Sequence, residues 1–358
     1  MPGKLQNGTE INSIPRPINV ELKSKKIIHE AEHPVRWSFM KILREFSTLR
    51  EYYPEINPYT EAYKVRDNTW ALYNDSFDGV GDVWMYLIDG PEKCMIVDTS
   101  FGVGDLKGLI KHLVGDKEIV VFNTHAHFDH CYGNAQFGKA YCHENEVPDM
   151  LTKVNPHIWD YLFNQTNEPV KVADKWVEPG MPLYTEFDPA DLIKYQDWEV
   201  VGVPDGHLFD LGNGYMVEAV HLPGHSAGQC GILDHQTGCL FIGDCTGIGG
   251  KPKGAPYREY CCVEAMYNAL TKLKPRLKDI SGVFPGHGAF DQHPILMQYL
   301  LDTCTAILKD PYNYDKVREM VRPSGVMKVA TKNIHQWTAL RYNPALVTMQ
   351  QILEDNEK

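Results

Sequence analysis

Residues 123–130, which read NTHAHFDH, constrain this chain more than any other stretch. Four potential metal ligands fall within six residues, directly after the apolar run IVVF at 119–122. Such a run predicts a buried strand, and a tight loop at its end can present several side chains to one point. Imidazole and carboxylate groups together suit zinc and its first-row neighbours. We therefore expect a metal site at the end of this strand.

Length and composition narrow the class of protein. The chain has 358 residues, which allows one large domain with extensions or two domains. Its net charge of −12 disfavours a nucleic-acid partner, because such binding depends largely on Lys and Arg neutralising phosphates. The N-terminus has no apolar signal segment, and no apolar run approaches the roughly 18 residues that span a bilayer. Nine cysteines without CxxC spacing fit a reduced, cytoplasmic protein.

The hydrophobic pattern divides the chain into three parts. Residues 1–75 are expected to form an N-terminal extension packed on the body, with a helix from 34 to about 53. Residues 76–290 form the body, in which strands alternate with helices. A stretch rich in aromatic residues interrupts the body at about 145–200; packing is the main interpretation, and a lid or substrate wall is the alternative. Residues 291–358 are expected to be mainly helical.

Further candidate ligands lie at the ends of strands predicted in the second half of the body. They are His225, Asp244 and His287. Because strand ends of one sheet system converge on one edge, ligands that are distant in sequence can meet there. Glycines flank these positions, and glycine permits the positive φ and close backbone approach that tight ligand loops need.

The full candidate set contains five histidines and two aspartates, enough for two metal ions. These residues are His125, His127, Asp129, His130, His225, Asp244 and His287. We assign to one ion the donors His125, His127 and His225. We assign to the other the donors Asp129, His130 and His287. Asp244 carries two oxygens and can bridge the ions.

This division leaves each ion an open position, which is typical of a catalytic site. Two divalent charges lower the pKa of a water held between them, so that a bridging hydroxide can attack a polarised carbonyl or phosphoryl group. Asp129 is the candidate catalytic residue, since it can hold the proton of the nucleophile and pass it to the leaving group.

The ligand pattern resembles the metallo-β-lactamase superfamily over about residues 80–290. The resemblance implies an α/β fold, an αββα sandwich of two mixed sheets with helices on the outer faces and the metals at one edge. It also implies that Asp98 orients the metal loop without binding metal. Among the branches, the lactonase-like and glyoxalase II-like proteins carry the same ligand set. The branch that binds zinc through a cysteine is disfavoured, because Asp244 occupies that position.

We therefore expect a cytoplasmic, dinuclear metal-dependent hydrolase that cleaves an ester-like bond (lactone, ester, thioester or amide) in a small molecule. Zn²⁺ is the expected metal, with Fe or Mn as alternatives. The competing hypotheses are a phosphodiesterase acting on a nucleotide-like substrate, an iron-dependent sulfur dioxygenase, and a binding protein that lost turnover. No nucleic acid or membrane is expected as a partner, and a homo-oligomer is compatible with the sequence.

Overall fold

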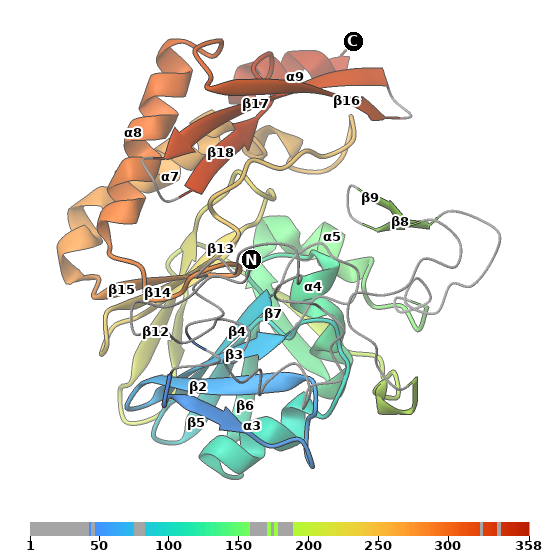
Figure 1. The fold of residues 1–358 in the computed structure, drawn as a ribbon, viewed down its shortest axis with the longest axis vertical. Helices are drawn as coiled ribbons and strands as arrows, with labels where there is room; N and C mark the ends of the chain where they lie inside the picture. The colour runs from blue at the N-terminus through green and yellow to red at the C-terminus, as the bar shows by residue number, and fades with distance from the viewer. Residues whose placement is uncertain are drawn as a thin grey trace, which may run out of the picture.

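Two β-sheets stacked face to face, with helices on their outer faces, form the body of the molecule (Figure 1). The first sheet has eight strands and the second has five. The computed structural model describes Leu43 and residues 47–74, 83–157, 170–172, 175–177, 189–322, 325–334 and 338–357.

The eight-stranded sheet is antiparallel in its first half and parallel in its second. Its strands, in spatial order, are β1 (Arg50–Tyr52), β2 (Thr60–Arg66), β3 (Thr69–Asn74), β4 (Val83–Asp89), β5 (Lys93–Val97), β6 (Glu118–Phe122), β7 (Lys139–His143) and β10 (Glu199–Val203). Strands β5, β6, β7 and β10 are parallel, so their carboxyl ends lie at one edge. The helices on its outer face are α3 (Leu106–Val114), α4 (Phe128–Cys131) and α5 (Val147–Leu151).

The five-stranded sheet is antiparallel except at one edge. Its strands, in order, are β11 (Leu208–Asp210), β12 (Met216–His221), β13 (Cys230–Asp234), β14 (Cys239–Gly243) and β15 (Gly282–Pro285). Strands β14 and β15 are parallel, and they are joined through α7 (Val263–Leu273), which packs on the outer face. Helix α8 (Ile295–Lys309) follows β15 and packs beside α7.

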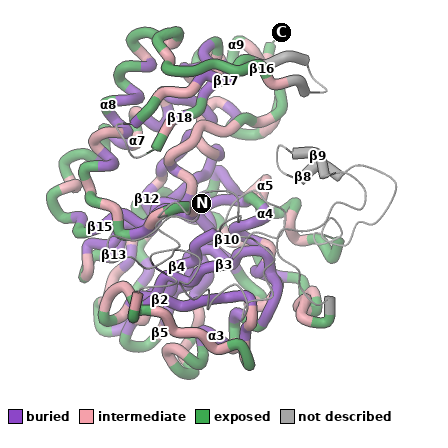
Figure 2. Tube along the Cα trace, in the orientation of Figure 1, coloured by how far each residue is buried: buried purple, intermediate pink, exposed green. Residues whose placement is uncertain are grey.

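Strand β4 shows why the body has layers on both sides of each sheet. Trp84, Tyr86 and Ile88 point into the core between the two sheets. Met85 and Leu87 point to the opposite face, beneath the helices. Successive side chains of a strand face opposite sides, so a strand that is apolar on both faces must be covered on both. Figure 2 shows the strands around β3 and β4 as buried. The expected αββα sandwich is confirmed.

The C-terminal segment is not mainly helical, and this expectation was wrong for residues 316–322, 325–334 and 338–342. Strands β16 (Lys316–Arg322), β17 (Gly325–Ile334) and β18 (Thr338–Tyr342) form a three-stranded antiparallel sheet, followed by α9 (Met349–Glu357). The proline after α8 ends helical propagation, and the valines beyond it favour strands. Buried residues of β17 and β18 pack with α7 and α8.

Residues 50–74 also differ from the expected extension, because β1, β2 and β3 continue the eight-stranded sheet. Each pairs antiparallel with the next strand, and β3 pairs with β4. Where a helix was expected from 34 to about 53, Arg50–Tyr52 form strand β1 instead, and residues 34–42 and 44–46 lie outside the described part of the chain. Tyr63, Ala71 and Tyr73 are buried between the sheets, which explains why these strands join the body.

The segment 145–200 contains short elements and no long helix or strand within its described part. They are the end of the 3-10 helix η3 (Glu144–Glu146), α5, β8 (Val170–Val172), β9 (Lys175–Val177), η4 (Pro189–Asp191) and the start of β10. Tyr195 and Trp198 pack against the core beneath the eight-stranded sheet, as the packing interpretation expected. The side chains of the other aromatic residues in this segment lie outside the described part. Among the described helices, none has the length and apolar character to cross a membrane.

Candidate metal centre

Loops at the strand ends bring the seven predicted ligands together in two neighbouring groups. The first cluster consists of His125, His127, His225 and Asp244, and the second cluster consists of Asp129, His130 and His287. Within each cluster the ligand atoms lie within 4.8 Å of one another. The loop after β6 belongs to the eight-stranded sheet, whereas the loops after β12, β14 and β15 belong to the five-stranded sheet. The clusters therefore form between two sheets rather than along the edge of one.

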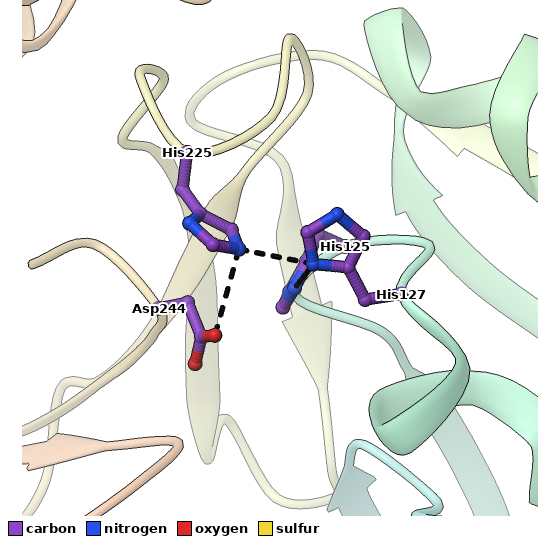
Figure 3. A group of neighbouring side chains, drawn as sticks. All are labelled: His125, His127, His225 and Asp244. Atoms are coloured by element: carbon purple, nitrogen blue, oxygen red, sulfur yellow. Dashed lines mark hydrogen bonds and ion pairs between the residues drawn. The ribbon is translucent and has the colours of Figure 1, made fainter. Parts of the chain in front are cut away.

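Three ring nitrogens converge in the first cluster (Figure 3). His127 Nδ1 lies 2.9 Å from His125 Nε2 and 3.0 Å from His225 Nε2. Asp244 Oδ2 lies 3.5 Å from the same nitrogen of His225. Around a tetrahedral zinc ion with bonds of about 2.0–2.1 Å to nitrogen, any two ligand nitrogens lie roughly 3.3 Å apart. The spacing of these nitrogens therefore fits one tetrahedral ion.

The protonation states in the first cluster also suit a divalent cation. Burial lowers the pKa of His125 well below its usual value and lowers that of His225 to about 3, so both rings are neutral near pH 7. Burial alone would raise the pKa of Asp244, but the nearby rings of His287 and His130 have the larger, opposite effect. The pKa of Asp244 therefore lies well below its usual value, and the carboxylate stays ionised. Neutral imidazole and ionised carboxylate are the forms that bind metal.

The second cluster combines two imidazoles with the carboxylate of Asp129. His287 Nε2 lies 3.2 Å from Asp129 Oδ2 and 3.3 Å from His130 Nε2. Burial lowers the pKa of His130, but the carboxylates of Asp129, Asp244 and Asp98 together outweigh burial and raise it to about 9. A pocket that raises the pKa of a buried imidazole in this way favours positive charge, whether a proton or a cation supplies it.

Asp244 connects the two clusters. Its Oδ1 lies 3.5 Å from His130 Nε2, and its Oδ2 lies 3.5 Å from His225 Nε2 and 3.4 Å from His287 Nε2. Oδ1 is buried and has no hydrogen-bond donor among the described residues. A buried carboxylate oxygen without a donor is costly. A cation beside this oxygen would satisfy it, so the residues present fit a metal centre.

Asp98 fixes which nitrogen of two histidines faces the centre. Its Oδ2 accepts a hydrogen bond from the Thr124 hydroxyl at 2.9 Å and lies 2.8 Å from His130 Nδ1, while Oδ1 accepts the Thr124 N–H at 2.8 Å. His130 therefore carries its proton on Nδ1. Because the Thr124 hydroxyl donates to Asp98, it accepts from His125 Nδ1 at 3.0 Å. Once His130 gives up its second proton, as metal binding requires, Nε2 of both rings presents a lone pair to the site.

Two further histidines near the site, His143 and His221, have structural roles. The rings of His143 and His221 stack at 3.7 Å with 5° between their planes, and His221 Nε2 donates to the carbonyl of Ala227 at 3.0 Å. Sequence reasoning missed Glu146, which accepts hydrogen bonds from two of the ligand loops. No motif marks this residue, and its partners lie 20 and more residues away along the chain.

Comparisons with known proteins identify the family of the chain. The family model described as the metallo-beta-lactamase superfamily matches residues 78–314. Human acyl-coenzyme A thioesterase MBLAC2 is 24% identical over 214 residues, which cover 57% of this chain and 72% of that protein. Hydroxyacylglutathione hydrolase GloC of Haemophilus influenzae is 33% identical over 88 residues, 24% of this chain and 39% of GloC.

A solved metallo-beta-lactamase from Pontibacter korlensis has 16% sequence identity and a TM-score of 0.43, over 69% of this chain and 99% of that one. The family match covers more than half of the chain and includes all seven candidate ligands. The chain belongs to the metallo-beta-lactamase superfamily and is a metal-dependent hydrolase.

Proposed function

We propose that this protein is a dinuclear, zinc-dependent hydrolase that cleaves a thioester bond in a small acyl compound. The observation that carries the proposal is the position of Asp244, whose carboxylate lies against His225 of the first cluster and against His130 and His287 of the second. The choice of a thioester among ester-like bonds is supported by the similarity to a protein named as an acyl-coenzyme A thioesterase.

The two clusters would hold one divalent ion each, with Asp244 shared between them. Ions bound there would supply Lewis acidity toward the substrate carbonyl and toward the attacking water. The protein's own contribution is to orient the donors: Asp98 and Thr124 turn the Nε2 atoms of His125 and His130 inward. Fixed donors hold the centre in place without reorganisation during the reaction.

Asp129 is the proposed proton carrier. Its Oδ2 lies against His287 at 3.2 Å, so Oδ1 is the atom assigned to receive a proton from the attacking water. In the overall reaction a C–O bond forms at the acyl carbon, the C–S bond breaks, and the proton passes to the departing sulfur. The products are a carboxylic acid and a free thiol.

The remaining features support a small-molecule enzyme of the cytoplasm. All nine cysteines are free and buried, in keeping with a reduced compartment. The net charge of −12 gives no support for a polyanionic partner.

The test combines metal analysis with a substrate panel. The purified protein is analysed for metal content and assayed against acyl thioesters, simple esters, lactones and bis-p-nitrophenyl phosphate, before and after chelation. We expect two metals per chain, preference for the thioesters, and activity that is lost on chelation and restored by Zn²⁺. The matched variants are Asp244→Asn, which is expected to lose activity, and Asp205→Asn, which removes a surface acid paired with Lys272 and is expected to leave it unchanged.

Each contrary result has a defined meaning. Fewer than one metal per chain, or activity indifferent to chelation, would contradict the metal-dependent mechanism. One metal per chain would contradict the dinuclear centre. Preference for the phosphodiester would replace the thioester with a phosphorylated substrate, and preference for a lactone or ester would change the substrate class within the same mechanism.

A further inference from the structure

Glu146 is a buried carboxylate that contacts two of the ligand loops. It ends the short helix η3 after β7 and is only 1% exposed. Its Oε1 accepts the backbone N–H of Ala126 at 2.8 Å. Its Oε2 accepts the hydroxyl of Ser226 and the N–H of Gly228, each at 2.8 Å. The two oxygens of one side chain therefore join three donors from two separate loops.

These loops carry three of the four donors of the first cluster. Ala126 lies between His125 and His127, on the loop after β6. Ser226 directly follows His225, on the loop after β12. The first loop comes from the eight-stranded sheet and the second from the five-stranded sheet. The carboxylate thus holds together, across the two sheets, the segments that place these three imidazoles.

The fit at this contact is tight. A Cβ atom at position 228 would lie 2.3 Å from the backbone nitrogen of Glu146, so the close approach needs glycine there. Among the described residues, no ligand of the second cluster donates a hydrogen bond to the Glu146 carboxylate. Its bonds go instead to backbone and side-chain groups next to the imidazoles of the first cluster.

We propose that Glu146 is a positioning residue for the first cluster and sets its affinity for metal. The inference rests on the proposed metal centre and adds to it a residue that binds no metal itself. By tying Ala126 to Ser226 and Gly228, Glu146 fixes the separation of His127 Nδ1 and His225 Nε2, which is 3.0 Å. Residues that orient metal ligands typically contribute 10–100-fold in affinity.

A carboxylate suits this position better than an amide. All three partners donate, and a carboxylate has acceptors only. A glutamine must direct its NH₂ group either toward the N–H of Ala126 or toward Ser226 and Gly228. The Ser226 hydroxyl can rotate to accept, but a backbone N–H cannot. Glu146→Gln therefore keeps the size of the side chain and loses at least one bond between the loops.

The experiment isolates the first cluster by removing a ligand of the second. In an Asp129→Ala background, Co²⁺ is titrated into the protein with and without Glu146→Gln, and binding is followed by visible absorption. We expect about tenfold weaker Co²⁺ binding with Glu146→Gln, with an unchanged circular dichroism spectrum. The matched control is Glu264→Gln, since Glu264 also accepts a backbone N–H, that of Met349 at 2.7 Å. This control should leave Co²⁺ binding unchanged.

A second variant keeps the test decisive if Glu146→Gln does not fold. Ser226→Ala removes one of the three bonds without a steric change, and about threefold weaker Co²⁺ binding is expected in the same background. Unchanged Co²⁺ affinity in Glu146→Gln, or in Ser226→Ala when the first variant is unfolded, overturns the inference. Failure of the wild-type protein to bind Co²⁺ at all overturns the proposed function itself.

Discussion

The substitution Asp98→Asn tests whether this buried carboxylate controls the ligands through their tautomers. Asp98 has a φ of +66°, a conformation that asparagine tolerates better than alanine, so the backbone stays close to its present form. An asparagine with its oxygen at the Oδ2 position keeps the contacts to the Thr124 hydroxyl and His130 but turns its NH₂ toward the N–H of Thr124. The opposite orientation turns the NH₂ toward His130 Nδ1.

Either orientation lowers the affinity of the centre for metal by an amount that can be estimated. A hydrogen bond to a charged group contributes about 1.5–3 kcal/mol. Since 1.4 kcal/mol corresponds to a factor of ten, the expected loss of metal affinity is roughly tenfold to hundredfold. In the second orientation His130 must move its proton to Nε2 to accept at Nδ1, which removes the lone pair that faces the second cluster. The loss should therefore be greatest at the second cluster.

The assay is a competitive Zn²⁺ titration against a chromophoric chelator, with thermal unfolding of the metal-free protein as a parallel measurement. Asp98→Asn should weaken one Zn²⁺ more than the other. Asp105→Asn is the matched control, because Asp105 caps α3 by accepting the N–H of Gly108 at 2.7 Å and belongs to neither cluster. Wild-type affinity for both ions in a folded Asp98→Asn protein would refute the assignment of Asp98.

Two further predictions concern turnover and stability. Asp129→Ala should reduce kcat severely and lower the metal content from two ions to one while the fold survives; unchanged kcat with full metal content would show that Asp129 is misassigned. Burial and the neighbouring ring of His221 lower the pKa of His143 to about 3, below its unfolded value of about 6.5. The unfolded state then binds more protons between these values, so stability falls as the pH falls, by about 2 kcal/mol at pH 5. Urea unfolding at pH 7 and pH 5 should show this loss of unfolding free energy, and His143→Asn should reduce it. An equal loss between the two pH values in the wild type and in His143→Asn would contradict the assignment.

The ligand loops could be predicted from the sequence because their information is local. The apolar run before His125 and the similar runs before His225, Asp244 and His287 predict strands by composition alone. The structure places strands β6, β12, β14 and β15 there. Tight loops at strand ends then require small residues and polar side chains, which the sequence also shows. Once the ends of these four strands lie together, the seven ligands fall into the two clusters.

Features that depend on long-range pairing could not be predicted in this way. Strands β1–β3 became part of the sheet because β3 pairs with β4 and the other two pair in succession, and a propensity argument contains no information about these partners. Strands β16 and β17 form for a similar reason, since their mutual pairing and the packing of β17 against α8 decide their conformation. Glu146 escaped prediction because an isolated glutamate in a polar stretch is ordinarily a surface residue.

The position of the centre between the two sheets connects its metal affinity to the packing of the whole body. The first cluster takes His125 and His127 from the side of the eight-stranded sheet and His225 and Asp244 from the side of the five-stranded sheet. Ions bound as proposed would bridge the sheets and add their binding free energy to the stability of both. The same geometry makes the sheet spacing a determinant of affinity, because ligands on opposite sides move apart when the sheets do. Only direct connections between the loops, such as Glu146, can hold the donors together independently of the distant core.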